Sequence, residues 1–237
     1  MKGISLQSAL VSALVLLAAP AWAQDYKAIL ANPERPEAEK SIDPIRKPEE
    51  MLKFYGVKRG DKVGDLMASR GYYTVILAQV VGDKGVVYSA NPTVRDETRE
   101  RFKNPAYANV KLVEGGMGTV ALPQDGSLDF VLINLDYHEV APGDRPALNQ
   151  RVFAALKPGG VYGVVDHAAA DGAGDSAAKT LHRIERSLVV SEATAAGFKL
   201  AGESDLLKSP EDPHTTNAIK EQRGKSDRFV LKFEKPK

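Results

Sequence analysis

The chain of 237 residues contains no cysteine. This absence excludes disulfide bridges, thiolate zinc sites, iron–sulfur clusters and a cysteine nucleophile. An excess of charge of one sign is missing as well, since 32 Lys and Arg stand against 31 Asp and Glu, a formal charge of +1. No net charge therefore draws the protein onto nucleic acid or an anionic membrane, and we expect no nucleic-acid partner. Any chemistry must use oxygen and nitrogen groups.

A long hydrophobic run is also missing, because the most apolar stretch, residues 4–19 at the amino terminus, is short for a bilayer span of about 20 residues. Lys2 precedes this stretch, Pro20 ends it, and Ala21-Trp22-Ala23 before Gln24 fits a signal-peptidase site. The pattern predicts a cleaved signal peptide over residues 1–23 and export to the periplasm. The mature chain, Gln24 to Lys237, would carry no stable membrane span.

The remaining chain divides into an arm and one α/β domain. Residues 24–47 are rich in Pro, Glu and Lys without a sustained apolar period, which predicts an extended N-terminal arm. Over residues 48–237, short apolar strands alternate with helices, which predicts a doubly wound, Rossmann-like α/β fold with helices on both faces of the sheet. The expected strands are 62–67, 85–90, 110–113, 128–135, 161–165, 198–206 and 228–233; the expected helices are 48–55, 72–81, 94–102, 145–156 and a long one at 177–196.

Four motifs follow one another in this domain: Gly60-Asp61-Lys62-Val63-Gly64-Asp65-Leu66, Gly71-Tyr72-Tyr73-Thr74, Leu156-Lys157-Pro158-Gly159-Gly160 and Ala196-Gly197-Phe198-Lys199-Leu200. In their order and spacing the chain resembles the class I S-adenosylmethionine-dependent methyltransferases, and more closely the predicted exported members of that superfamily. The resemblance implies a seven-stranded sheet of order 3-2-1-4-5-7-6 with the last strand antiparallel. It also implies S-adenosylmethionine as cofactor and a small or medium-sized molecule as methyl acceptor.

The cofactor is expected at the carboxyl ends of the strands, where an open doubly wound sheet binds its ligands. The residues that the resemblance places there are Asp65, Met67, Ser69, Gly71, Asn91, Gly115, Asn134 and Leu135. The first loop departs from the family pattern Asp-x-Gly-x-Gly-x-Gly, because Met67 and Ser69 stand where two of the glycines are expected. Asn91 stands where the family has an acid for the ribose hydroxyls, so its hydrogen bonds lack charge assistance.

Polar residues directly follow the fourth and fifth strands: Tyr137 and His138 after one, Asp166 and His167 after the other. These strands are neighbours in the implied sheet, so we expect the four side chains to share one crevice. His138, His167 or Asp166 would serve as the base that deprotonates the acceptor, and Tyr137 would position the acceptor.

Two other interpretations use the same crevice. Asp136, His138, Asp166 and His167 offer the nitrogen and oxygen ligands that suit a divalent metal, but the sequence has no compact metal motif, and we assign no metal ligand. A non-catalytic protein that binds another ligand on the same fold is the alternative to an enzyme. His182, on the expected long helix, is interpreted as a packing or hydrogen-bonding residue.

Overall fold

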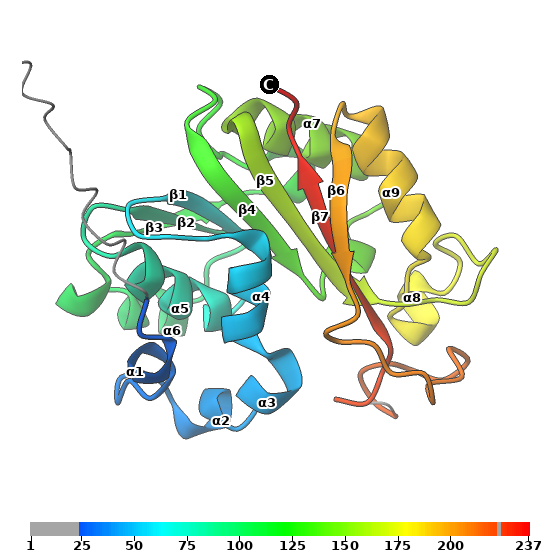
Figure 1. The fold of residues 1–237 in the computed structure, drawn as a ribbon, viewed down its shortest axis with the longest axis horizontal. Helices are drawn as coiled ribbons and strands as arrows, with labels where there is room; N and C mark the ends of the chain where they lie inside the picture. The colour runs from blue at the N-terminus through cyan, green and yellow to red at the C-terminus, as the bar shows by residue number, and fades with distance from the viewer. Residues whose placement is uncertain (1–23, 222–223) are drawn as a thin grey trace, which may run out of the picture.

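A single seven-stranded sheet organises the protein (Figure 1). The computed structural model describes residues 24–221 and 224–237, so the expected signal peptide lies outside the described residues. The strands are β1 (Lys62–Leu66), β2 (Val86–Asn91), β3 (Val110–Glu114), β4 (Leu128–Asn134), β5 (Leu156–His167), β6 (Lys199–Ser204) and β7 (Arg228–Glu234). Their order is β3-β2-β1-β4-β5-β7-β6, and β7 runs antiparallel to β5 and β6. The expected sheet order and the antiparallel last strand are confirmed. β5 begins at Leu156 rather than at residue 161, because Leu156 already pairs with Leu128 of β4.

Two hydrophobic cores lie on opposite faces of this sheet. Neighbouring residues of a strand point to opposite faces, so Phe130 and Leu132 of β4 join one core while Val131 and Ile133 join the other. The helices α4 (Pro48–Tyr55) and α5 (Tyr72–Val81) belong to the first core; α7 (Arg145–Ala155) and α9 (Arg186–Ala195) belong to the second. The shorter elements are α6 (Asp96–Arg101), α8 (Ala178–Leu181), η1 (Pro105–Tyr107), η2 (Met117–Thr119) and η3 (Tyr137–Glu139). The burial of both sheet faces explains why the strands read as continuous apolar runs.

The N-terminal arm is compact where the sequence predicts an extended chain. It forms three short helices, α1 (Tyr26–Leu30), α2 (Glu37–Lys40) and α3 (Asp43–Arg46). Arg35 is buried in the arm and makes a bidentate pair with Asp43, with N–O distances of 2.8 and 2.6 Å. The hydroxyl of Tyr72, in the first turn of α5, donates to the same carboxylate at 2.6 Å. These tertiary contacts fold the arm onto its own chain, next to the start of α5.

The predicted long helix over residues 177–196 is wrong. The chain leaves α8 at His182, whose φ of +53° is left-handed, and enters α9 only at Arg186. Between the helices, the buried Arg183 side chain makes a bidentate pair with Asp212 at 2.8 and 2.9 Å. This buried charge pair turns the backbone out of the helix. The apolar residues of 177–196 keep a helical spacing across the break, so the sequence pattern does not show it.

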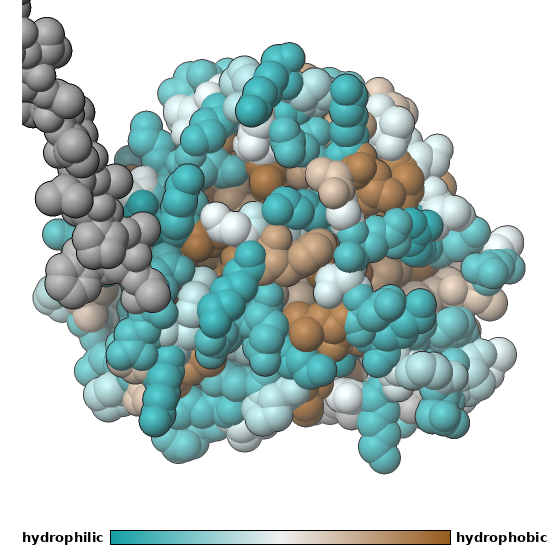
Figure 2. Space-filling view, in the orientation of Figure 1, coloured by the Kyte–Doolittle hydropathy of each residue, from teal (hydrophilic) through white to brown (hydrophobic). Residues whose placement is uncertain are grey.

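The outer surface is mixed in character. Figure 2 shows polar residues over most of one face, with apolar residues between them near its middle. Within residues 24–221 and 224–237, every helix is too short or too polar to cross a membrane.

Candidate active site

The loop after β1 has a backbone suited to glycine, although it holds only one. Met67, Ser69 and Gly71 have φ angles of +52°, +53° and +88°, so every second residue of the loop is left-handed. These are the positions at which the family pattern has glycine. Left-handed backbone costs an ordinary residue about 1–2 kcal/mol, and such strain persists where the surrounding structure fixes it. The loop therefore keeps the path of a glycine-rich cofactor loop, with two side chains added.

Asp65, at the end of β1, is almost fully buried beneath this loop. The Thr74 hydroxyl donates to its carboxylate at 2.6 Å and lies 3.0 Å from the Ser89 hydroxyl, which belongs to β2. Burial raises the pKa of Asp65 to about 7, although the hydrogen bond from Thr74 acts in the opposite direction. The carboxyl group is thus half-protonated near neutral pH.

Asn91, at the end of β2, holds the loop in place. Its Oδ1 accepts a hydrogen bond of 2.6 Å from the backbone N–H of Ser69. Its Nδ2 is buried and has no hydrogen-bond partner among the described residues. A buried donor without a partner costs about 1–3 kcal/mol, and a ribose oxygen would satisfy it. The amide thus fits a cofactor ribose with one atom while it orders the loop with the other.

The other expected cofactor residues lie at neighbouring strand ends. The backbone N–H of Gly115 donates to the carbonyl of Asn91 at 3.1 Å, and a Cβ on Gly115 would meet nothing within 4 Å. Asn134 ends β4, and Leu135 follows it with a left-handed φ of +63°. Since β1 lies between β2 and β4 in the sheet, these residues border the loop on both sides. Space beside Gly115 and a donor at Asn91 are features that a nucleoside requires.

At the ends of β4 and β5, Asp166 and His138 form a buried pair. The Asp166 carboxylate is fully buried and accepts three N–H groups: the His138 backbone at 2.8 Å, the His138 ring Nδ1 at 2.7 Å and the His167 backbone at 2.8 Å. Burial acts to lower the pKa of His138, but the Asp166 charge and hydrogen bond outweigh it, so the pKa of His138 is raised overall. Nδ1 carries a proton toward Asp166, and Nε2 points away from it.

Burial shifts the pKa of His167 and the pKa of Asp136 in opposite directions. Burial lowers the pKa of His167 to about 4, and its Nδ1 lies 2.8 Å from the Ser226 hydroxyl. Burial raises the pKa of Asp136 to about 7, with a further contribution from the Asp166 charge. The two imidazoles are 6.1 Å apart between ring centres, so His167 stays neutral beside a more basic His138. Divergent pKa values in one crevice are typical of acid–base sites.

Tyr137 does not point toward this pair. Its hydroxyl donates to Glu192 of α9 at 2.7 Å and accepts from Asn149 of α7 at 2.8 Å. The ring is fully buried in the core formed with these helices. A contact with an acceptor would require these bonds to break, so the structure brings three of the four predicted catalytic residues together and places Tyr137 behind them.

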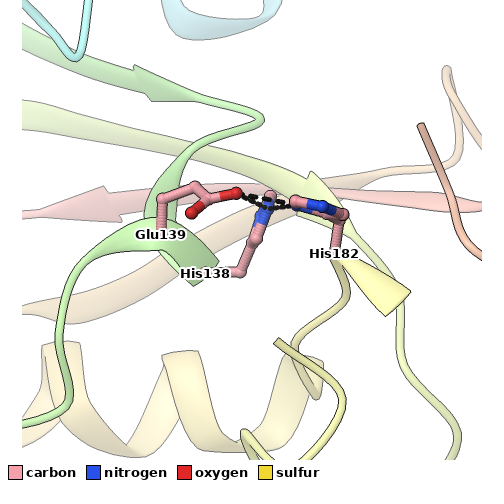
Figure 3. A group of neighbouring side chains, drawn as sticks. All are labelled: His138, Glu139 and His182. Atoms are coloured by element: carbon pink, nitrogen blue, oxygen red, sulfur yellow. Dashed lines mark hydrogen bonds and ion pairs between the residues drawn. The ribbon is translucent and has the colours of Figure 1, made fainter. Parts of the chain in front are cut away.

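Two residues that the sequence analysis did not assign to the site complete it. His182 follows α8, and its ring, the His138 ring and the Glu139 carboxylate of η3 point toward one another (Figure 3). Nδ1 of His182 is 2.7 Å from Oε1 of Glu139 and 3.3 Å from Nε2 of His138. The helix break at His182 makes this approach possible. In the sequence, the only sign of the cluster is that Glu139 directly follows His138.

The fold is a doubly wound α/β sheet, and in sheets of this kind ligands bind outside the carboxyl ends of the strands, where these residues lie. Residues 63–160 match the family model described as a methyltransferase domain. The matched segment contains β1 through the start of β5, including the loop over residues 67–71. Over residues 63–160 the chain is therefore similar to a methyltransferase domain, and S-adenosylmethionine is the cofactor that this similarity indicates.

Relatives of known name agree with this assignment. The demethylmenaquinone methyltransferase of Geobacillus sp. (strain WCH70) is 28% identical over 114 residues, 47% of this chain and 47% of that protein. The ubiquinone/menaquinone biosynthesis C-methyltransferase of Pasteurella multocida is 32% identical over 108 residues, 44% of this chain and 39% of that protein. This chain thus spans less than half the length of these relatives.

Solved structures share the fold. A SAM-dependent methyltransferase from Aquifex aeolicus has a TM-score of 0.59 at 21% identity, over 85% of this chain and 98% of that one. The geranyl diphosphate C-methyltransferase of Streptomyces coelicolor, solved with Mg2+, geranyl-S-thiolodiphosphate and S-adenosylhomocysteine, has a TM-score of 0.64 at 14% identity, over 88% of this chain and 84% of that one. At these identities the likeness concerns the fold alone.

Proposed function

We propose that the protein transfers a methyl group from S-adenosylmethionine to a small or medium-sized acceptor. The observation that carries the proposal is the loop over residues 67–71, with three left-handed residues in alternate positions beside the unpartnered Nδ2 of Asn91. The methyltransferase domain match covers this loop. The named relatives are a demethylmenaquinone methyltransferase and a ubiquinone/menaquinone biosynthesis C-methyltransferase, which supports an acceptor in the small-molecule range.

The residues that would hold the cofactor are Asp65, the loop from Met67 to Gly71, Asn91, Gly115 and the segment Asn134–Leu135. When bound, the cofactor supplies a methyl group on a sulfonium that is already activated for transfer. Asn91 donates to a ribose oxygen and keeps the Ser69 amide fixed, while the backbone at Gly115 leaves room for the nucleoside. The protein contributes alignment, which is the main requirement of such a transfer.

The acceptor would bind on the side of His138, Asp166 and His167. Asp166 fixes the orientation of the His138 ring through two of its three hydrogen bonds. With Nδ1 committed to Asp166, the only ring nitrogen of His138 that faces outward is Nε2. An acceptor that loses a proton on methylation would lose it beside this atom.

The test is calorimetric titration of the purified protein with S-adenosylmethionine and S-adenosylhomocysteine. We expect micromolar dissociation constants for the wild type and at least about tenfold weaker binding for Asn91→Ala, which removes a hydrogen bond worth about 1 kcal/mol and leaves the Ser69 N–H unpaired. Asn104→Ala is the matched control, because the Asn104 side chain bonds only the Ala106 backbone and Glu34 among the described residues, and neither is an expected cofactor residue. Absence of binding by the wild type would refute the proposal and favour a non-catalytic protein on a methyltransferase fold.

We further propose that the protein is exported to the periplasm and that residues 1–23 are removed. Support comes from the order of Lys2, the apolar stretch, Pro20 and Ala21-Trp22-Ala23 in the sequence. Because Trp22 is the only tryptophan, the processed protein should show no tryptophan fluorescence and an amino terminus at Gln24. Leu14→Arg, which interrupts the apolar stretch, should retain the emission and keep the protein in the cytoplasm. Tryptophan emission from protein recovered in the periplasm would contradict cleavage.

A further inference from the structure

We propose that His138, Glu139 and His182 form a binding site for a divalent transition-metal ion. The metal site does not depend on methyl transfer; its role toward an acceptor, given below, rests on the proposed function. The three residues come from two segments that are joined only by the tertiary fold, since η3 follows β4 and His182 ends α8 (Figure 3). Two imidazoles and a carboxylate form a ligand set that suits Zn2+, Fe2+, Co2+ or Mn2+.

The spacing of the three ligand atoms fits one ion. Nε2 of His138, Oε1 of Glu139 and Nδ1 of His182 are separated by 3.1, 2.7 and 3.3 Å. Ligands about 2.1 Å from an ion are roughly 3.0–3.5 Å from one another in octahedral or tetrahedral geometry. The triangle therefore needs adjustments of only a few tenths of an ångström to accept an ion on its open side.

When His138 is neutral, one contact of this triangle has no proton to share. His138 uses the proton on Nδ1 for Asp166, so neutral His138 presents a lone pair at Nε2. Glu139 presents only lone pairs, and the one proton of neutral His182 can serve its 2.7 Å contact with Glu139. A lone pair on Nε2 then faces the carboxylate 3.1 Å away. A cation bound by all three atoms removes this repulsion.

The surroundings prepare His138 to act as a ligand. Asp166 holds its Nδ1 at 2.7 Å, which directs Nε2 outward and raises its basicity. A carboxylate behind a ligating histidine is a common arrangement at metal sites. The backbone of His182 adds a second indication, because its left-handed φ of +53° is a strained conformation that directs the ring to the cluster.

The site is accessible from one side. The side chain of His138 is 1% exposed, while those of His182 and Glu139 are 26% and 44% exposed. An ion can therefore enter past Glu139 and keep open coordination positions, since the protein supplies only three ligands. We infer that an oxygen of the methyl acceptor takes one of these positions. With the ion bound, Nε2 of His138 is a ligand and no longer a base. The ion would instead lower the pKa of the acceptor's hydroxyl group, and the proton would leave to solvent along the exposed side.

The experiment is titration of the full-length protein, produced without a histidine tag, with Zn2+ by calorimetry and with Co2+ by visible absorption. We expect one equivalent of metal with a micromolar or lower dissociation constant. His182→Asn and Glu139→Gln should weaken binding at least about 100-fold, and Asp166→Asn, which removes the support of His138, about 10–100-fold. Asparagine tolerates left-handed backbone, so His182→Asn should fold normally.

His214→Asn is the matched control. His214 also has a left-handed φ, +59°, and its Nε2 also lies near a carboxylate, 3.1 Å from Asp227, but it lies outside the triangle. This variant should bind metal like the wild type. Equal losses in His182→Asn and His214→Asn, unchanged binding in His182→Asn, or no uptake by the wild type would overturn the proposal. The last result would mean that a protonated His138 holds Glu139 instead.

The metal titration contains no cofactor, so its outcome is separate from that of methyl transfer. Metal binding without S-adenosylmethionine binding would refute the proposed function and leave the metal site intact. If both hold, a chelator should abolish turnover and added Zn2+ or Co2+ should restore it, while cofactor affinity stays unchanged. Turnover that is insensitive to chelation would overturn the assigned role of the ion.

Discussion

Replacement of Asp65 by asparagine should stabilise the protein in alkaline solution. Asp65 is 3% exposed, and burial raises its pKa from 3.8 to about 7. Asparagine is uncharged and similar in shape, and its Oδ1 can still accept the hydroxyl of Thr74. The substitution thus removes mainly the cost of a buried charge.

The magnitude and its pH dependence follow from the pKa difference. Between about pH 4 and 7 the folded protein holds a proton on Asp65 that the unfolded chain has released, so the free energy of unfolding falls as the pH rises. The rise in the pKa of Asp65 from 3.8 to about 7 corresponds to roughly 4 kcal/mol at most, since each tenfold change in proton affinity is worth about 1.4 kcal/mol. Allowing for imperfect packing of the amide, we expect Asp65→Asn to gain about 2–4 kcal/mol over the wild type at pH 8.5 and much less at pH 4.5.

The assay is urea denaturation of both proteins at pH 4.5 and pH 8.5, with equal m-values as the condition for comparison. Asp83→Asn is the control, because the Asp83 side chain is 87% exposed and its pair with Arg59 spans 3.8 Å. That change should alter stability by less than about 1 kcal/mol at either pH. A stability gap for Asp65→Asn that is the same at both pH values, or a less stable variant at pH 8.5, would refute the reasoning.

Three further substitutions test contacts around the site. Asp166→Asn should lower stability by about 2–4 kcal/mol, or roughly 5–15 °C in thermal unfolding, because one of the three N–H groups that Asp166 accepts would face an amide N–H. Gly71→Ala should cost about 2–4 kcal/mol in urea denaturation, since its Cβ would lie 2.6 Å from the Phe102 ring at a φ of +88°; a loss below 1 kcal/mol would contradict this contact. Arg183→Met should cost about 3–5 kcal/mol in the same assay, because it leaves the fully buried Asp212 carboxylate without its partner, and a near-neutral result would show that solvent reaches that pair.

The strands of the sheet could be predicted from short apolar runs in the sequence, because both faces of the sheet are buried. Strands such as residues 128–134 are mostly apolar, and the sequence also contains the Lys-Pro-Gly-Gly motif and the apolar run that marks α5. The positions of the candidate residues could be predicted to the extent that they lie at strand ends: Asp65, Asn91, His138, Asp166 and His167 all lie at or just after the end of a strand.

Prediction from local sequence failed where contacts with distant residues determine the backbone path or the direction of a side chain. Tyr137 has the same sequence context as His138, but the groups that bind its hydroxyl come from α7 and α9. The helix break at His182 depends on Arg183 and its pair with Asp212. The spacing of apolar residues along the chain gives no sign of this pair. The left-handed angles of Met67 and Ser69 run against residue preference and follow from the loop's ties to Asn91 and the neighbouring strand.

The sequence by itself determined the fold class, the strand order through its resemblance, and the strand ends that carry polar residues. These depend on short-range periodicity and on motifs of a few residues, which one chain displays directly. Only the tertiary structure decided that Glu139 and His182 meet His138, that the arm packs beside α5, and that Tyr137 turns into the core. The contacts of His182 with His138, of the arm with α5 and of Tyr137 with α9 join residues 44, 29 and 55 positions apart. Their energies come from burial and charge pairing that no local window of sequence contains.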